Sequence, residues 1–93
     1  MIVRVFLNLD DFLSELETEE KHRMMYMTTP VQGGFVIYLT TLSKIDDIPV
    51  IYRYIERLQT NSPIPSDDLN KRLEEIFDTI GFKPMVGTYE TEG

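Results

Sequence analysis

Residue types that perform acid–base or nucleophilic chemistry are scarce in this chain of 93 residues. It has one histidine, His22, and no cysteine. A Ser/His/Asp arrangement would have to use His22, which lies among charged residues at the start of a predicted strand and is expected to be solvated. The Gly-x-Ser-x-Gly pattern of a nucleophile elbow does not occur. The sequence therefore predicts no catalytic residue.

Three pairs of adjacent aspartates are the candidate metal ligands: Asp10-Asp11, Asp46-Asp47 and Asp67-Asp68. Paired carboxylates are hard-ion ligands that suit Mg²⁺ or Ca²⁺. Each pair, however, coincides with a predicted helix start, where negative charge complements the free N–H groups and the helix dipole. Because capping explains all three pairs at once, we predict neither a metal site nor a cofactor.

The charge balance of the chain is acidic. Nine Lys and Arg against 16 Asp and Glu give a net charge of −7 and a pI near 4.5. Such a body repels phosphate, so direct binding of nucleic acid is not expected. The exception is Arg53 and Arg57, four residues apart on a predicted helix. They are candidates for contact with an anion or a partner, or alternatively for pairing with carboxylates on the same helix.

Carboxylates are concentrated in residues 8–20 and 67–80, both predicted to be largely helical. If the two helices lie on the same side of a sheet, their charges form one negative field. Such a field could imitate nucleic acid and inhibit a DNA- or RNA-binding enzyme. The simpler interpretation is solubility, and the i, i+4 pairs Asp67–Lys71 and Asp68–Arg72 would weaken the field. Both interpretations stay open.

Periodicity predicts seven elements in the order β-α-β-β-α-α-β. Predicted strands span 1–8, 21–29, 35–42 and 82–89. Predicted helices span 9–20 and 67–80, with another from Asp46 or Asp47 through Leu58. Ser66 is the expected cap of the last helix and Gly81 its left-handed end. The second and third strands are expected to form a hairpin, and Pro84, which lacks an N–H donor, places the last strand at a sheet edge.

Without one of the two adjacent helices, this order is that of an α+β ferredoxin-like plait, an antiparallel sheet with helices on one face. Right-handed crossovers would place the first and third strands at the centre. The length fits a single domain over residues 1–93, with 90–93 as a frayed tail. No apolar run reaches the roughly 18–20 residues of a membrane span, and no secretory signal is visible, so we expect a cytoplasmic protein.

A plait leaves one sheet face bare, and here neither face of the strands is polar. The third strand presents outward either Phe35, Ile37 and Leu39 or Val36, Tyr38 and Leu42, and the first presents either Ile2 and Phe6 or Val3, Val5 and Leu7. The candidate interface residues are Val36, Tyr38, Phe35, Ile37, Met25 and Met27. We expect a homodimer formed through the bare face, because twofold self-pairing is the simplest cover.

Other covers and functions stay open at this point. The extra helix or the connector around Ile64 could fold over the bare face, or a different protein could bind there. The first hypothesis is a small interaction or regulatory module. The alternatives are the acidic mimic, an enzyme of the dimeric α/β-barrel kind that uses Tyr38, Arg4 or His22 in an interfacial cavity, and a small-ligand sensor with such a cavity.

Overall fold

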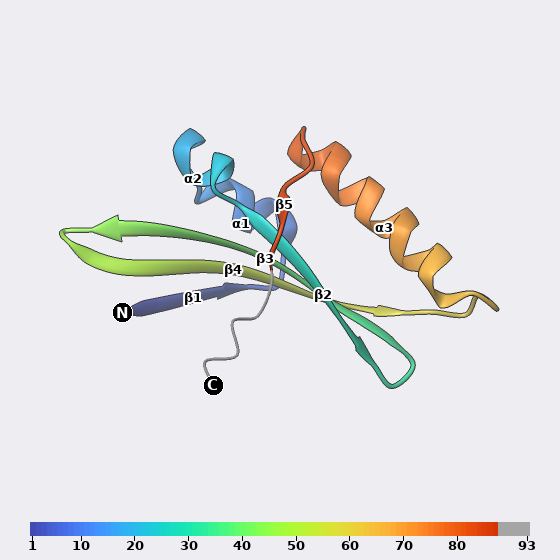
Figure 1. Ribbon diagram of the computed structural model, residues 1–93. Helices are drawn as coiled ribbons and strands as arrows, with labels where there is room; N and C mark the ends of the chain where they lie inside the picture. The colour runs from blue at the N-terminus through green and yellow to red at the C-terminus, as the bar shows by residue number, and fades with distance from the viewer. Residues whose placement is uncertain (88–93) are drawn as a thin grey trace.

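The computed structural model describes residues 1–87, which form one five-stranded sheet with three helices on one of its faces (Figure 1). The strands are β1 (Ile2–Phe6), β2 (Met25–Val31), β3 (Gly34–Ile45), β4 (Ile48–Gln59) and β5 (Met85–Val86). The helices are α1 (Leu9–Ser14), α2 (Thr18–His22) and α3 (Pro65–Ile80). The predicted α+β class is confirmed, and the helices lie on one side of the sheet, as expected.

The helix predicted from Asp46 or Asp47 through Leu58 is wrong, because this segment is strand β4. It pairs antiparallel with β3 along its whole length, from Ile45↔Ile48 to Gly34↔Gln59. Val50, Tyr52 and Tyr54 are buried at every second position, which is the period of a strand covered on one face. The segment is also rich in β-branched and aromatic residues, which pack well on a pleated surface.

This change alters the topology. The strand order is β1-β4-β3-β2-β5, and the ferredoxin-like order is not confirmed. β1 pairs parallel with β4 at an edge of the sheet rather than at its centre, whereas β3 is central as predicted. The sheet is mixed rather than antiparallel, because β5 also pairs parallel with β2. β5 forms the other edge, as Pro84 predicted. The predictions for Thr88, Tyr89 and the tail 90–93 lie outside the described residues.

The turn between β3 and β4 explains the pair Asp46-Asp47, which caps no helix. Both residues have positive φ, 51° and 66°, and they form a two-residue connection between Ile45 and Ile48. Two positive φ angles are typical of the type I′ turn, whose twist matches that of the flanking strands. Aspartate tolerates this conformation better than most side chains, and glycine tolerates it best.

Replacing Asp47 by glycine is therefore expected to stabilise the fold by about 0.5–1 kcal/mol, since it removes a left-handed side-chain penalty. Urea unfolding measures the difference. Lys44→Gly on the extended part of β3 is the matched control, and it should destabilise by a similar amount. An Asp47→Gly variant no more stable than the native chain contradicts the assignment of this turn.

The two acidic helical regions have well-defined ends. The predicted helix 9–20 is divided into α1 and α2, and the predicted strand from residue 21 begins only at Met25. Asn8 caps α1 by accepting a hydrogen bond from the Asp11 N–H at 3.0 Å. α3 begins at Pro65 with Ile64, not Ser66, in the cap position. It ends at Gly81 with φ of 97°, as predicted.

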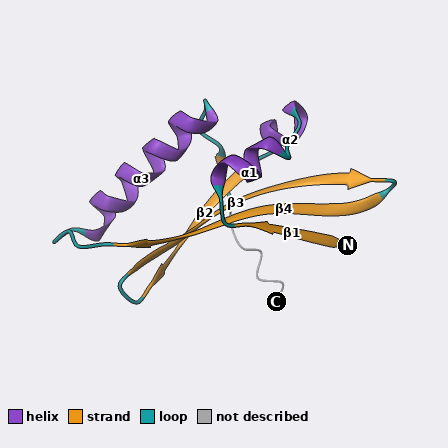
Figure 2. Cartoon of the chain, turned by 180° about the vertical axis from the view of Figure 1, so that it is seen from behind, coloured by secondary structure: helices purple, strands orange, loops and turns teal. Residues whose placement is uncertain are grey.

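The core lies between the helices and one face of the sheet (Figure 2). Phe12, Ile37, Leu39 and Ile76 are fully buried there. Phe12 makes edge contact with Phe6 and lies 6.0 Å from Tyr54 between ring centroids. The helices therefore cover the face of the sheet that carries the even-numbered residues of β4 and the odd-numbered residues of β3.

Candidate interaction surface

The other face of the sheet carries no helix in the described chain (Figures 1 and 2). Because strand side chains alternate, the register fixes which residues point to it. We call this surface the open face. Its residues are Val3 and Val5 of β1, Met25, Met27, Thr29 and Val31 of β2, Val36, Tyr38, Thr40, Leu42 and Lys44 of β3, Pro49, Ile51, Arg53, Ile55, Arg57 and Gln59 of β4, and Met85 of β5.

The structure divides the predicted interface residues between the two faces. Val36, Tyr38, Met25 and Met27 point to the open face, and Leu42 with Val3 and Val5 joins them. Val36 is only 9% exposed there, so its neighbours already cover most of its side chain. Phe35 and Ile37 lie on the helix-covered face instead. Ile37 is 0% exposed and Phe35 packs against the core, so these two are core residues and not part of a surface.

The open face is apolar across four neighbouring strands. Val3, Val5 and Leu42 are each more than half exposed, and Met25 is 39% exposed. Single exposed apolar side chains are ordinary on a protein surface, but a contiguous apolar patch of this kind marks an interaction site. The helix predicted to cover this face does not exist, since its residues form β4. The connector around Ile64 leads into α3 on the covered side (Figure 1), so cover by another molecule is the remaining expectation for the part of the chain that the structure describes.

Charge on the open face has one sign. Its outward strand positions include Lys44, Arg53 and Arg57 and no aspartate or glutamate. Arg53 donates from Nε to Thr40 Oγ1 at 3.3 Å, and its guanidinium lies 5.9 Å from the centre of the Tyr38 ring. Arg57 is exposed opposite Val36. Arg53 and Arg57 thus share one face, as predicted, but on a strand rather than on a helix.

A shallow hollow of about 470 Å³ extends the open face toward the tip of the β3–β4 hairpin. Its walls are mostly apolar and come from Met1, Leu42 and Pro49, with Arg23 and Lys44 at the sides. Arg23 is held there by a hydrogen bond from Nη2 to the Leu42 carbonyl at 3.2 Å. The hollow adds one cation, Arg23, to a surface that already carries Lys44 and lacks carboxylates.

A polar cluster that the sequence analysis missed joins β4 to α3 on the covered face. Arg72 donates to both oxygens of Glu56, at 2.6 and 2.8 Å, and Tyr54 donates its hydroxyl to the same carboxylate at 2.5 Å. Burial and this carboxylate raise the pKa of Tyr54 to about 12. Burial opposes ionisation of Glu56, but the bonds from Arg72 and Tyr54 outweigh it and hold the Glu56 pKa below its ordinary value. The i, i+2 spacing of Tyr54 and Glu56 signals a shared face only when the segment is a strand.

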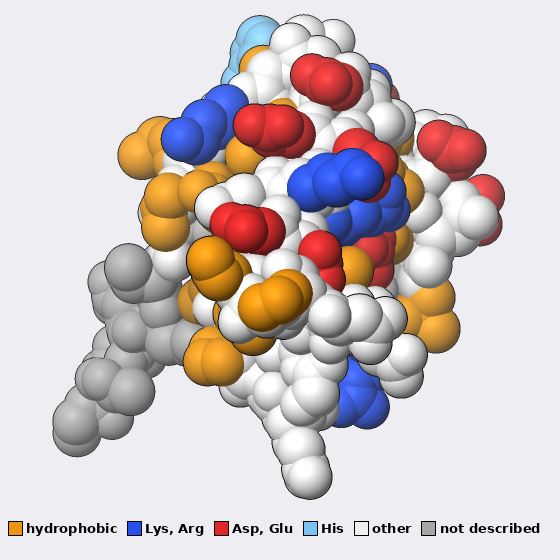
Figure 3. Space-filling model, turned by 90° about the vertical axis from the view of Figure 1, so that its right-hand side faces the viewer, with side chains coloured by type: hydrophobic (Ala, Val, Ile, Leu, Met, Phe, Trp, Pro, Cys, Tyr) orange, Lys and Arg blue, Asp and Glu red, His pale blue; other side chains and the backbone are white. Residues whose placement is uncertain are grey.

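The acidic side chains lie mostly on the helical side, opposite the open face. α1, α2 and α3 all lie above the same face of the sheet (Figure 1), and acidic side chains gather over the helical part of the surface in Figure 3. A cleft of about 640 Å³ between the α1–α2 segment and β3 is lined by Glu15, Glu17, Glu19 and Glu20, together with Arg23 and Lys44. The expected layout of one acidic side is thus present.

One part of the predicted charge pairing on α3 is wrong. Arg72 pairs with Glu56 and Glu75 rather than with Asp68. Asp68 accepts hydrogen bonds from the backbone N–H groups of Asn61 and Ser62, at 3.1 and 3.3 Å, and so fixes the connector before the helix. This carboxylate is used within the fold.

The residues proposed for an enzymatic alternative are not brought together. Tyr38 lies on the open face, whereas Arg4 lies on the covered side and pairs with Glu15 at 3.1 Å. His22 is exposed at the end of α2. Within residues 1–87, no group of three or more His, Asp or Glu side chains is placed to hold a metal ion. The geometry gives no support to acid–base chemistry among these three side chains.

Comparison with known proteins adds no family, since no protein-family model, curated protein or solved structure matches the chain. Among the helices of the described residues, none has the length and apolarity needed to cross a membrane. The open face, with its contiguous apolar side chains, is the surface of the described chain that points to a binding role.

Proposed function

We propose that this chain is a small non-catalytic interaction module, acting in the cytoplasm, that self-associates through its open face. The supporting observation is an apolar surface that extends over four strands on the side of the sheet without helices. Contiguous apolar patches mark interfaces more often than ordinary solvated surface. A second copy is the simplest cover, because in a twofold dimer the same patch serves both partners.

The size of the open face suits such a dimer. β3 and β4 are each 12 residues long. At about 3.3 Å per residue and 4.8 Å between strands, the five strands provide a flat area of about 600 Å². Side-chain relief increases the area accessible to a partner. A stable interface typically buries roughly 800 Å² on each partner, so the open face is large enough to form most of one.

The cations on the open face set the expected strength of the association. Face-to-face pairing brings Arg53 and Arg57 of two copies close to each other with no carboxylate on either face. The hydrogen bond from Arg53 to Thr40 and its contact with the Tyr38 ring replace part of its hydration. Because a guanidinium is also weakly hydrated, the cost of burying Arg53 is lowered. Like charges still repel, so we expect reversible pairing, which is useful in a regulatory module.

Solution mass measured by light scattering behind a sizing column, over a dilution series, tests the proposal. Native chains should associate, and Leu42→Lys should reduce the mass because it adds a cation to a face that is already positive. Ile64→Lys is the matched control: Ile64 is 58% exposed, similar to Leu42 at 51%, but it precedes α3 away from the open face. It should leave the mass unchanged.

Salt distinguishes self-association from capture of a charged partner. Raising NaCl from about 0.1 M to about 1 M shortens the Debye length from roughly 10 Å to 3 Å. Self-association should hold or strengthen, since the charges it brings together repel each other. A native chain that is monomeric at every concentration and salt level, or a Leu42→Lys variant that associates like the native chain, contradicts the proposal.

The acidic mimic is the second candidate, and one observation favours it: both acidic helical regions lie on the same side of the sheet (Figure 1). It predicts tight binding to a basic nucleic-acid-binding protein through the helices, and loss of that binding at about 1 M salt. Replacing Glu74 and Asp78 on α3 by glutamine and asparagine should weaken the binding and leave the solution mass unchanged. Binding that persists in high salt excludes the mimic.

A further inference from the structure

The two edges of the sheet are protected to different degrees. β5 is an edge strand of two residues that follows Lys83 and Pro84, and short strands, prolines and lysines are common protections against edge pairing. β1 forms the opposite edge with five residues, no proline and no lysine. An unpaired edge presents free N–H and C=O groups in a row, which is a template for another strand.

β1 is exposed on both of its sides. Ile2 is 47% exposed on the covered side, and Val3 and Val5 are 52% and 54% exposed on the open face. Its one charged residue, Arg4, does not point into solvent as a free charge. Arg4 is exposed, but it pairs with Glu15 at 3.1 Å and lies 5.3 Å from the ring centre of Phe6, so its charge is partly offset.

We propose that β1 pairs antiparallel with β1 of a second copy, which joins two sheets into one. A second copy of β1 suits this edge because the strand sequence, Ile2-Val3-Arg4-Val5-Phe6, is nearly symmetric about Arg4. A twofold axis at Arg4 pairs Val3 with Val5 on the open face and Ile2 with Phe6 on the covered side. Apolar and β-branched cross-strand pairs of this kind stabilise an antiparallel ladder.

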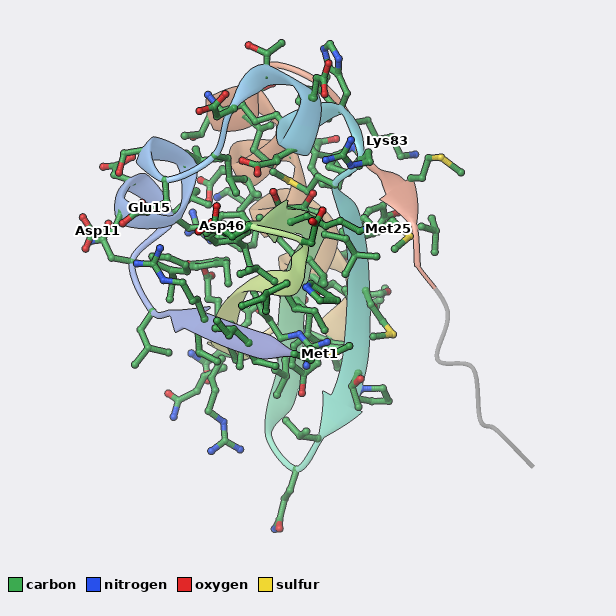
Figure 4. All side chains as sticks on the ribbon, turned by 90° about the vertical axis from the view of Figure 1, so that its left-hand side faces the viewer. Met1, Asp11, Glu15, Met25, Asp46 and Lys83 are labelled. Atoms are coloured by element: carbon green, nitrogen blue, oxygen red, sulfur yellow. The ribbon has the colours of Figure 1, made fainter. Side chains whose placement is uncertain are left out.

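The charges at the edge are also self-complementary. The axis brings the two Arg4 side chains together, and like charges directly opposite each other would destabilise the pair. Each, however, carries its own Glu15, at the C-terminal cap of α1. Figure 4 shows Asp11 and Glu15 projecting from α1 on the side of β1, away from Met25 of β2. The twofold axis therefore creates an alternating cluster in which each Arg4 lies between its own Glu15 and the second copy's Glu15.

Edge pairing uses different residues from pairing of the open faces, so the two interfaces are compatible. The edge axis is perpendicular to the sheet, whereas a face-to-face axis lies parallel to it. Two perpendicular twofold axes close a tetramer, the common next step after a dimer in symmetric assemblies. The edge interface does not depend on the proposed function, because β1–β1 pairing leaves the open face uncovered.

The β1–β1 pairing is tested by the light-scattering mass of five proteins at equal concentration. They are the native chain, Arg4→Glu, Leu42→Lys, the double variant Arg4→Glu/Leu42→Lys and a charge-swapped variant. Arg4→Glu gathers four carboxylates at the proposed axis and should halve the native mass. Leu42→Lys should also halve it, and the double variant should be monomeric. The charge-swapped variant Arg4→Glu/Glu15→Arg restores the alternating cluster and should recover the native mass, which excludes misfolding as the cause.

Hydrogen exchange of the β1 amides gives the second measurement. Amides at the free edge should exchange more slowly at high than at low protein concentration in the native chain, and equally fast in Arg4→Glu. A mass halved by Leu42→Lys but unchanged by Arg4→Glu overturns the edge proposal and leaves the proposed function standing. The reverse pattern supports the edge and contradicts the open-face interface, and a monomeric native chain overturns both.

Discussion

Glu56→Ala is expected to cost the fold about 2–4 kcal/mol, because it leaves Arg72 and the Tyr54 hydroxyl without their shared partner under the helix. The Glu56 side chain is 17% exposed and that of Arg72 is 32% exposed, so the pair is partly desolvated and its loss is only partly compensated by water. For a domain whose total stability is about 5–15 kcal/mol, this is a large fraction. Urea unfolding of the native chain and the variant measures it.

Glu75→Ala provides the matched control. Glu75 accepts from the same arginine at 3.4 Å, but its side chain is 57% exposed. Exposed pairs of this kind contribute about 0–1 kcal/mol. An equal loss of unfolding free energy in Glu56→Ala and Glu75→Ala would contradict the prediction, because it would mean that bidentate pairing and burial at Glu56 add no stability.

The pH dependence of stability follows from the same cluster. The pKa of Glu56 is lowered in the fold, so its contribution is present at neutral pH and is lost as the pH falls through the folded-state pKa. The pKa of Tyr54 is raised from 10.0 to about 12, so its contribution is present below pH 10 and is lost as the pH rises from 10 toward 12. Tyr54→Phe should remove this alkaline slope, and a slope identical to that of the native chain would contradict the assignment.

Local signals in the sequence were sufficient for α3 and for the β2–β3 hairpin. α3 has acidic residues in its first turn and Gly81 at its end, and neither signal depends on distant parts of the chain. They identified this helix although not its exact cap. The turn before Gly34 likewise separates two β-branched segments that pair with each other.

β4 could not be identified in the same way, because its sequence satisfies two periods. Ile51, Tyr54, Ile55 and Leu58 fit a helical stripe, whereas Val50, Tyr52 and Tyr54 fit a strand. The segment forms a strand because it pairs with β3 over 12 residues and with β1 on its other side. Both partners are distant in the sequence or unknown before folding, so the periodicity of the segment alone does not reveal these contacts. The error then propagated to the strand order and to the expected position of β1.

The open face was predictable as a class of surface but not in its residues. Every long strand has apolar residues on both sides, so a one-sided helical layer necessarily leaves an apolar face. Which side is covered depends on where α1 and α3 pack. They pack on the side of Ile37, which is therefore in the core, whereas Tyr38 points to the open face. The Arg53–Tyr38–Thr40 contact depends on strand register and could not be predicted from a helical assignment.

Replacing Arg53 by methionine is expected to tighten self-association at least about tenfold, which corresponds to about 1.4 kcal/mol of binding free energy. Face-to-face pairing buries this cation twice without a counter-ion, and uncompensated burial costs several kcal/mol per ion before the contacts to Tyr38 and Thr40 offset part of it. Methionine keeps the length and apolar character of the side chain and removes the charge.

Sedimentation tests this prediction by measuring the dimer dissociation constant of the native chain and of Arg53→Met. Arg57→Met is a second variant. Arg57 is exposed nearer the end of the sheet, so its effect should have the same direction and be smaller. If Arg53→Met instead weakens association, the cation must meet an anion in the assembly. Because the described positions of the open face carry no carboxylate, that anion would have to come from another surface of the second copy, and pairing of two open faces would be contradicted.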